Sequence, residues 1–126
     1  MWLETESGTF LSGVHGGSTF SKFRGAIRLA GMKPIVSIVI PAYNEEDCLA
    51  EVHDRLTQVL SKLETAYEIL FVDDGSADGT FERIRSISDR DPTVRGLRLS
   101  RNFGHQAALT AGLEMARGEA VITMDA

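Results

Sequence analysis

The sequence predicts an α/β domain: a mostly parallel sheet with helices on both of its faces. From residue 34 onward, short apolar runs rich in β-branched residues alternate with amphipathic segments in the order β-α-β-α-β-α-β, joined by short connections. This alternation is typical of a parallel sheet covered by helices. The composition agrees, since 43% hydrophobic and 25% charged residues are ordinary for a globular chain.

Four apolar runs are expected to form the strands. The first, IVSIVI, is a continuous β-branched run of the kind that is buried on both faces of a sheet. The third is less apolar, because Arg95 and Arg98 interrupt it. The expected strands cover residues 35–40, 67–72, 94–99 and 120–124.

The first helix is expected directly after Asn44. Asn44 is a suitable N-cap residue, and the three acids that follow it would lie in the first turn, where the helix dipole favours negative charge. Apolar residues from Leu49 to Leu63 then recur at helical spacing and form one stripe.

Two further helices are expected between the later strands. Ser76 or Asp78 is a candidate N-cap for the second helix, which carries apolar residues at helical spacing. The third helix is Ala-rich, covers residues 104–117, and is expected to be closed by Gly118 at its C′ position.

The composition changes sharply near residue 33. Residues 1–33 hold six of the twelve glycines and carry four basic and two acidic residues, whereas residues 34–126 carry nine basic and sixteen acidic residues. The first segment shows no period of 2 or 3.6 and lacks the apolar region of a signal peptide. We expect residues 1–33 to be a flexible leader or the product of an upstream start codon, and residues 34–126 to form the domain.

Several function classes are excluded by the same inspection. The net charge of −5 argues against nucleic-acid binding, which usually needs a basic stripe. No apolar stretch approaches the roughly 20 residues that cross a bilayer. The single Cys48 cannot form an internal disulfide, and no zinc-site spacing is present. Neither a G-x-G-x-x-G nor a P-loop motif occurs. A cytoplasmic location is expected.

The candidate site lies where the strands end. In open α/β sheets, ligands bind outside the carboxyl ends of the strands, and here those ends carry four carboxylates, an arginine and a tyrosine. Asp73 and Asp74 could accept hydrogen bonds from a nucleobase or from ribose hydroxyls. They could equally form an Asx-turn, with Asp74 as a helix cap. Asp125 could be a helix cap or a metal ligand.

Other chemically active side chains have simpler explanations. His105 follows Gly104 at the start of the third helix, where it could approach a phosphate or serve the cap region. Cys48 is expected to be a partly buried thiol and no nucleophile. His53 has acidic neighbours on the first helix and is expected on a solvated face.

Three blocks of this sequence resemble glycosyltransferase family 2, of the inverting GT-A type. They are VSIVIPAYNEE (36–46), ILFVDDGSADGT (69–80) and LSRNFGHQAALTAGLEMARGEAVITMDA (99–126). Within the family, the last block is most similar to the dolichyl- and polyprenyl-phosphate sugar transferases. The resemblance implies a Rossmann-like nucleotide-binding half. It also implies transfer of a sugar from a nucleotide-diphosphate donor to an acceptor, polyprenyl phosphate.

The resemblance also implies roles for particular residues. Asp73 matches the position that accepts from the base, with Asp74 close by, and Arg101 matches a basic position near the diphosphate. Asp125 matches the first acid of the D-x-D motif, which binds Mg²⁺ or Mn²⁺ on the donor. Four positions match the block that lines the base and ribose pocket: Pro41, Ala42, Tyr43 and Glu45.

The sequence departs from the family pattern at its end. Ala126 would be the middle residue of the D-x-D motif, so the second acid, the catalytic base and the acceptor-binding half are expected beyond it. Membrane contact, at the cytoplasmic face, is expected only through that later part. The alternative is an inactive, truncated fragment that at most binds nucleotide.

Overall fold

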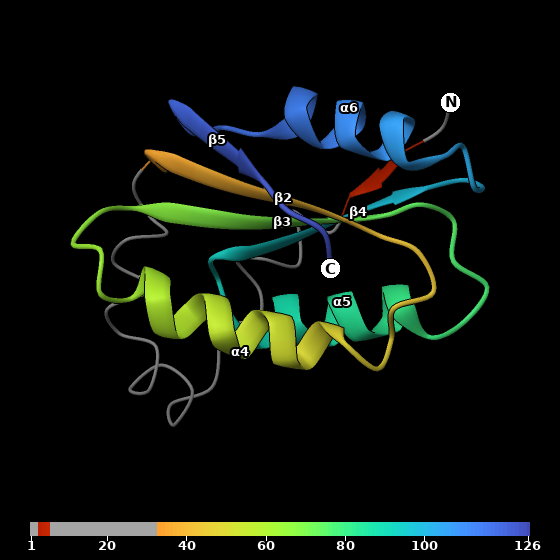
Figure 1. Ribbon diagram of the computed structural model, residues 1–126, viewed down its shortest axis with the longest axis horizontal. Helices are drawn as coiled ribbons and strands as arrows, with labels where there is room; N and C mark the ends of the chain where they lie inside the picture. The colour runs from red at the N-terminus through yellow and green to blue at the C-terminus, as the bar shows by residue number, and fades with distance from the viewer. Residues whose placement is uncertain (1–2, 6–32) are drawn as a thin grey trace.

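The computed structural model describes residues 3–5 and 33–126, which form one five-stranded sheet with helices on both faces (Figure 1). The strand order is β1-β4-β3-β2-β5. Strands β2 to β5 are parallel to one another, and β1 is antiparallel to its neighbour β4. The predicted α/β class is therefore confirmed.

The observed elements follow the predicted order closely. The strands are β1 (Leu3–Thr5), β2 (Val36–Ala42), β3 (Tyr67–Asp73), β4 (Val94–Leu99) and β5 (Ala120–Thr123). The helices are α4 (Leu49–Leu60), α5 (Thr80–Arg90) and α6 (His105–Met115).

Helices α4 and α5 cover one face of the sheet and α6 covers the other (Figure 1). Successive side chains of a strand point to opposite faces, so the central strands supply two separate cores. In β2, Ile38 and Ile40 join the core under α4 and α5, whereas Val39 joins the core under α6. Burial on both sides explains why β2 and β3 are almost continuously apolar.

The predicted start of the first helix is wrong. Helix α4 begins at Leu49, with Cys48 in the N-cap place. Asn44 lies in a left-handed conformation with φ of 53°, and its Oδ1 accepts a hydrogen bond from the amide of Ala77 at 3.0 Å. Asn44 therefore joins two loops, since its side chain bonds a distant backbone group instead of the helix.

The other two helix ends also differ from the prediction. Gly79 occupies the N-cap place of α5, although Oδ1 of Asp78 still accepts from the amide of Thr80 at 3.0 Å. Helix α6 ends before Ala116, whose backbone is extended. Gly118 is therefore not at C′. Its amide donates to Oγ of Ser37 at 2.8 Å, so a tertiary contact accounts for its position.

Strand β1 lies in the segment where the sequence predicted no element. It pairs with β4 in the register Leu3 with Leu99 and Thr5 with Leu97. The remaining leader residues, 1–2 and 6–32, lie outside the described part of the chain. The flexible leader and the domain boundary stay predictions.

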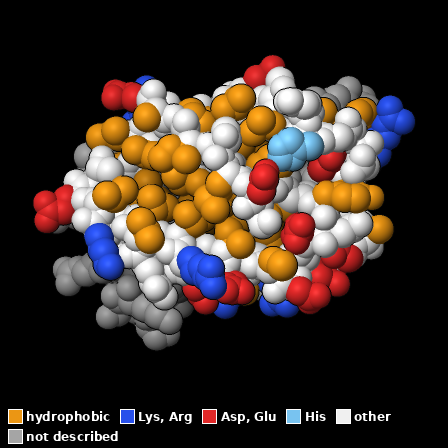
Figure 2. Space-filling view, in the orientation of Figure 1, with side chains coloured by type: hydrophobic (Ala, Val, Ile, Leu, Met, Phe, Trp, Pro, Cys, Tyr) orange, Lys and Arg blue, Asp and Glu red, His pale blue; other side chains and the backbone are white. Residues whose placement is uncertain are grey.

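Strand β5 forms an exposed edge of the sheet, pairing only with β2 among the described strands. All four of its residues are exposed. Figure 2 shows hydrophobic side chains gathered on this side of the molecule, over β5 and its neighbours. The exposed large hydrophobic residues of this segment are Val121, Ile122 and Met124.

A buried carboxylate, Glu68, connects the segment after α6 to the sheet. It lies near the start of β3, at the edge of the sheet away from the candidate site. Its Oε1 accepts hydrogen bonds from Oγ of Ser37 at 2.7 Å and from the amide of Arg117 at 2.8 Å. Its Oε2 accepts from Nη1 of Arg95 at 2.8 Å and from the Arg117 guanidinium. Burial alone would raise the pKa of Glu68, but these bonds outweigh it and hold the pKa below its ordinary value.

His53 does not lie on a solvated face as predicted. Its Nε2 lies 2.7 Å from Oδ2 of Asp91. Asp91 is buried, and its other oxygen, Oδ1, accepts from the amide and hydroxyl of Thr93. Burial opposes ionisation of Asp91, but the bonds from His53 and Thr93 outweigh it and hold its pKa below the ordinary value. This cluster fastens α4 to the connection that precedes β4.

Acid should therefore weaken the fold through Asp91. In the unfolded chain, the Asp91 carboxylate takes up a proton near the ordinary Asp pKa of about 3.9, which is a higher pH than in the folded chain. The ionised carboxylate therefore favours folding above that pH. The contribution is fully present above about pH 5 and is lost as the pH falls toward the folded pKa. Urea unfolding measured from pH 7 to pH 3 should show a shallower acid dependence for Asp91→Asn than for the exposed control Asp89→Asn. Equal slopes would contradict this prediction.

Candidate functional site

The strand order places a ligand crevice between β2 and β5. The chain runs from β2 through β3 to β4 on one side of β2 and then returns to place β5 on its other side. Such a reversal is the point at which open α/β sheets bind ligands, outside the carboxyl ends of the strands. The fold alone thus indicates where the site should be.

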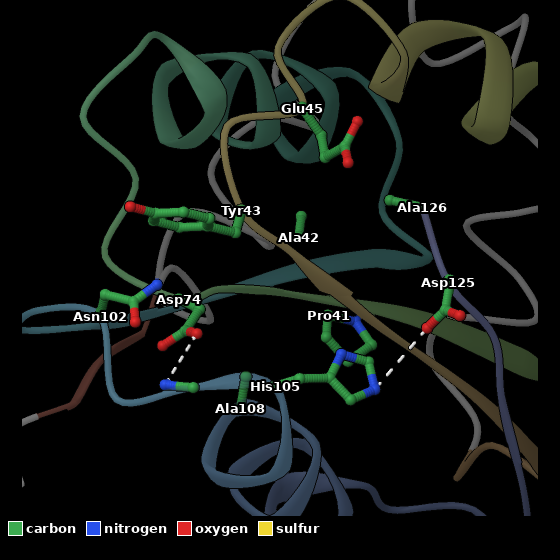
Figure 3. Close-up of a pocket in the computed structure, with 11 residues that line it drawn as sticks. Pro41, Ala42, Tyr43, Glu45, Asp74, Asn102, His105, Ala108, Asp125 and Ala126 are labelled. Carbon is green, nitrogen blue, oxygen red and sulfur yellow. Dashed lines mark hydrogen bonds and ion pairs between the residues drawn. The ribbon is translucent and has the colours of Figure 1, made fainter.

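A pocket of about 300 Å³ opens at that point (Figure 3). It is bounded by the segments that follow β2, β3, β4 and β5, so four strand ends contribute to it. Its lining residues are Pro41, Ala42, Tyr43, Glu45, Asp74, Asn102, Gly104, His105, Ala108, Asp125 and Ala126.

Six of the eight predicted site residues line this pocket. The two that do not are Asp73 and Arg101. Arg101 is exposed, and its guanidinium lies 4.6 Å from the centre of the Phe103 ring. Asn102 and Gly104 line the pocket without having been predicted; both stand in the segment after β4, which the sequence places at the sheet edge.

Asp73 does not line the pocket and is fully buried, with 0% exposure. Its Oδ1 accepts a hydrogen bond at 3.0 Å from the amide of Ser76, three residues further along, so the carboxylate bonds the loop that follows its own strand. Its Oδ2 lies 3.5 Å from Nε of Arg98. Burial raises the pKa of Asp73 even though Ser76 and Arg98 oppose the rise. In this geometry Asp73 shapes the turn.

Asp74 is also buried, but its carboxylate lines the pocket. Oδ1 accepts from the amide of Phe103 at 2.8 Å, and Oδ2 accepts from the amide of Gly104 at 3.1 Å. Asp74 therefore binds the backbone just before α6 and does not cap α5, the helix after its own strand, which was one of the alternatives that the sequence left open.

The loop after β3 also holds the loop after β2. Oγ of Ser76 accepts from the amide of Asn44, and Oγ1 of Thr80 accepts from the amide of Glu45, each at 2.9 Å. Oε2 of Glu46 accepts from the amide of Gly79 at 3.0 Å. The Asp-Asp-Gly-Ser segment and its continuation thus position the neighbouring loops on both sides.

His105 and Asp125 face each other across one end of the pocket (Figure 3). Nε2 of His105 lies 3.7 Å from Oδ1 of Asp125, and the side chains are 59% and 85% exposed. His105 is the first residue of α6, and Asp125 follows β5. Both side chains are therefore accessible to a ligand from solvent. Such access is required if His105 is to approach a phosphate, which is one of its two expected roles.

A divalent cation fits this end of the pocket only if a ligand shares its coordination. Within the described residues, no group of three or more His, Cys, Asp or Glu side chains could enclose a metal ion. Mg²⁺ commonly uses one or two carboxylates together with substrate phosphates and water. Asp125 therefore suits a cation that a bound diphosphate also ligates.

Cys48 is exposed, which corrects the expectation of a partly buried thiol. A hydrogen bond to Glu45 raises the pKa of Cys48, and the neighbouring acids act in the same direction. A raised pKa favours the protonated thiol, and the expectation that Cys48 is no nucleophile stays a prediction.

Comparison with known proteins identifies the family. The model for glycosyl transferase family 2 matches residues 37–126, which is most of the chain. The chain belongs to glycosyl transferase family 2. This membership agrees with the GT-A type of α/β half that the fold displays.

Named relatives in this family are similar over the same region. The chain is 48% identical over 90 residues to the uncharacterised glycosyltransferase YkcC of Bacillus subtilis (strain 168). It is 44% identical over 93 residues to an undecaprenyl-phosphate 4-deoxy-4-formamido-L-arabinose transferase of Aeromonas hydrophila. These matches cover 71% and 73% of this chain but only 28% of each relative, so the chain spans less than a third of their length.

Two solved glycosyltransferase structures have a similar fold, each with a TM-score of 0.59. The S. aureus protein TarS is 28% identical, and the match covers 75% of this chain and 27% of TarS. The Pyrobaculum calidifontis mannosyltransferase PcManGT, solved with GDP-Man and Mn²⁺, is 22% identical; the match covers 94% of this chain and 38% of that protein. Among the described residues, no helix is both long and apolar enough to cross a bilayer.

Proposed function

We propose that this chain supplies the nucleotide-sugar-binding part of an inverting glycosyltransferase that transfers a sugar to polyprenyl phosphate. One observation carries the proposal: the pocket at the reversal point of the sheet joins the β2 end to the carboxylates after β3 and β5. Its volume of about 300 Å³ lies at the lower end of the range for small-molecule sites.

The two ends of the pocket suit the two ends of a nucleotide-diphosphate sugar. Tyr43 is 48% exposed and lies on the side of Asn102 and Asp74 (Figure 3). An exposed aromatic ring offers a base a surface to stack on. The opposite end holds His105 and Asp125, where the diphosphate would lie. The base contact that the resemblance assigns to Asp73 stays a prediction, because Asp73 is buried and does not line the pocket.

The expected cofactor is Mg²⁺ or Mn²⁺. Asp125 would hold the ion together with the donor's phosphates, and His105 lies next to it. Such a cation would neutralise the charge that develops on the departing nucleotide diphosphate. The structure of PcManGT, which contains GDP-Man and Mn²⁺, is consistent with this expectation.

The acceptor class is inferred from relatives. Proteins 44–45% identical to this chain are named as undecaprenyl-phosphate sugar transferases. An acceptor that is already a phosphate needs little deprotonation, so a strong base is not required of these residues. Because the acceptor is a membrane lipid, we expect transfer at the cytoplasmic face of a membrane. Contact with that membrane is expected through a part of the protein beyond these residues.

Nucleotide binding without transfer is the second candidate. It is favoured by the small ligand set within the described residues, in which Asp125 stands alone with His105. A chain of this kind would bind a nucleotide and would not move its sugar. Binding and transfer must therefore be measured separately.

Titration with UDP and GDP in the presence of Mn²⁺ tests the binding step. We expect saturable binding of one nucleotide, and Mn²⁺ should broaden the NMR signals of His105 and Asp125 only when that nucleotide is present. Asp125→Asn should weaken Mn²⁺-dependent binding at least about tenfold, because one charged oxygen ligand is lost. The exposed control Asp89→Asn should bind as the wild type does. Failure of both nucleotides to bind would contradict the proposal.

Transfer is tested with undecaprenyl phosphate and radiolabelled UDP- and GDP-sugars. Label in the lipid fraction would support the enzyme. Nucleotide binding without labelled lipid would favour the second candidate for this chain.

A further inference from the structure

Asp74 offers little of its carboxylate to a ligand. Its exposed fraction is 4%, and each oxygen already accepts a hydrogen bond from a backbone amide, of Phe103 at 2.8 Å and of Gly104 at 3.1 Å. Hydrogen bonds to a charged acceptor contribute more than neutral ones. The carboxylate is therefore committed to the segment that leads into α6.

The backbone turns at Gly104, one of the two residues whose amides donate to Asp74. Gly104 has φ of 102° and ψ of 160°, a conformation that is almost restricted to glycine. His105, the first residue of α6, follows directly. The direction in which the chain leaves Gly104 therefore decides where the His105 ring lies.

The body of α6 is fixed independently. A Cβ on Gly112 would overlap Cγ1 of Val39, which shows how closely the helix backbone approaches the sheet. With α6 held there, Asp74 controls only the first turn. That turn places Nε2 of His105 3.7 Å from Oδ1 of Asp125 (Figure 3).

We propose that Asp74 is a positioning residue: it sets the entry into α6 and thereby holds His105 opposite Asp125 at the phosphate end of the pocket. The effect of this positioning on donor binding rests on the proposed function. Asp74 acts through His105, and His105 is the side chain that meets the donor's diphosphate.

The NMR test without ligand uses the full chain and the substitution Asp74→Asn. The asparagine NH2 group that replaces one carboxylate oxygen cannot accept a hydrogen bond, so the bond from the amide of Phe103 or of Gly104 is lost. The backbone amide signals of both residues should move, and the His105 ring signals should move with them. The amide signal of Arg117, bonded to Glu68 at the far end of α6, should stay in place and report an intact fold.

A double-mutant cycle then tests the coupling to binding, with Mn²⁺ and the nucleotide that binds the wild type as the probe. Asp74→Asn should weaken binding about tenfold in the wild-type background. In the His105→Ala background the same substitution should cost less than about twofold, because its effect passes through the missing ring.

The outcomes separate this inference from the proposed function. An equal loss in both backgrounds would overturn the inference, since Asp74 would then act directly on the ligand or on the fold as a whole. If the wild type binds neither UDP nor GDP, the proposed function fails. In that case the NMR signals recorded without ligand still test the inference. Unmoved His105 ring signals in Asp74→Asn would overturn it.

Discussion

Replacing Glu68 with alanine is expected to lower the free energy of unfolding by about 3–5 kcal/mol. The substitution removes one partner of a buried ion pair and leaves the Arg95 guanidinium, which is 6% exposed, without its carboxylate. An uncompensated buried charge is far more costly than the loss of a surface ion pair. The substitution also releases Ser37 and Arg117 from Glu68, so the link between α6 and β5 loses part of its attachment to the sheet.

Urea unfolding followed by circular dichroism measures this loss. Glu64→Ala removes an exposed glutamate and should change the stability by less than about 0.5 kcal/mol. Arg117→Ala is the intermediate case, because its side chain is 48% exposed and its backbone bond to Glu68 survives. A Glu68→Ala midpoint indistinguishable from that of Glu64→Ala would show that the network contributes little.

Replacing Gly75 with alanine is expected to disrupt the pocket as well as the fold. Gly75 has φ of 65°, which L-residues adopt at a cost of about 1–2 kcal/mol. The added Cβ would also overlap the backbone of Arg101 and Asn102. Backbone cannot move aside as a flexible side chain can, so the segment after β4 must shift. Because Asn102 and Gly104 line the pocket, nucleotide binding should fall together with stability.

Gly104→Ala separates the cost of the backbone conformation from the cost of the Cβ overlap. Its backbone conformation is also unfavourable for alanine, at about 1–3 kcal/mol, but its Cβ would meet nothing within 4 Å. Gly75→Ala should therefore lose more stability than Gly104→Ala in the same thermal unfolding experiment. Equal losses would mean that the 101–102 backbone yields without cost.

The sequence is sufficient to predict strands β2 to β5 and their succession along the chain, although not β1, because each central strand needs apolar residues on both faces. The run 94–99 is predicted to the residue despite two arginines, and the structure shows why they are tolerated. Arg95 pairs with Glu68, and Arg98 lies beside Asp73. Helix ends were less predictable, since Asn44 and Gly118 are suitable cap residues whose polar groups bond distant parts of the chain.

The sequence by itself determined the α/β class, the edge of the sheet that carries the site, and the resemblance to the family. Each of these depends on patterns that are local along the chain. Only the tertiary structure decided which of two adjacent aspartates lines the pocket, since both follow the same strand. Successive residues of a strand point to opposite sides, so Asp73 turns inward to Ser76 while Asp74 reaches the start of α6. The meeting of His105 with Asp125 was likewise decided by the packing of α6 and β5, because 19 positions of sequence separate the two residues.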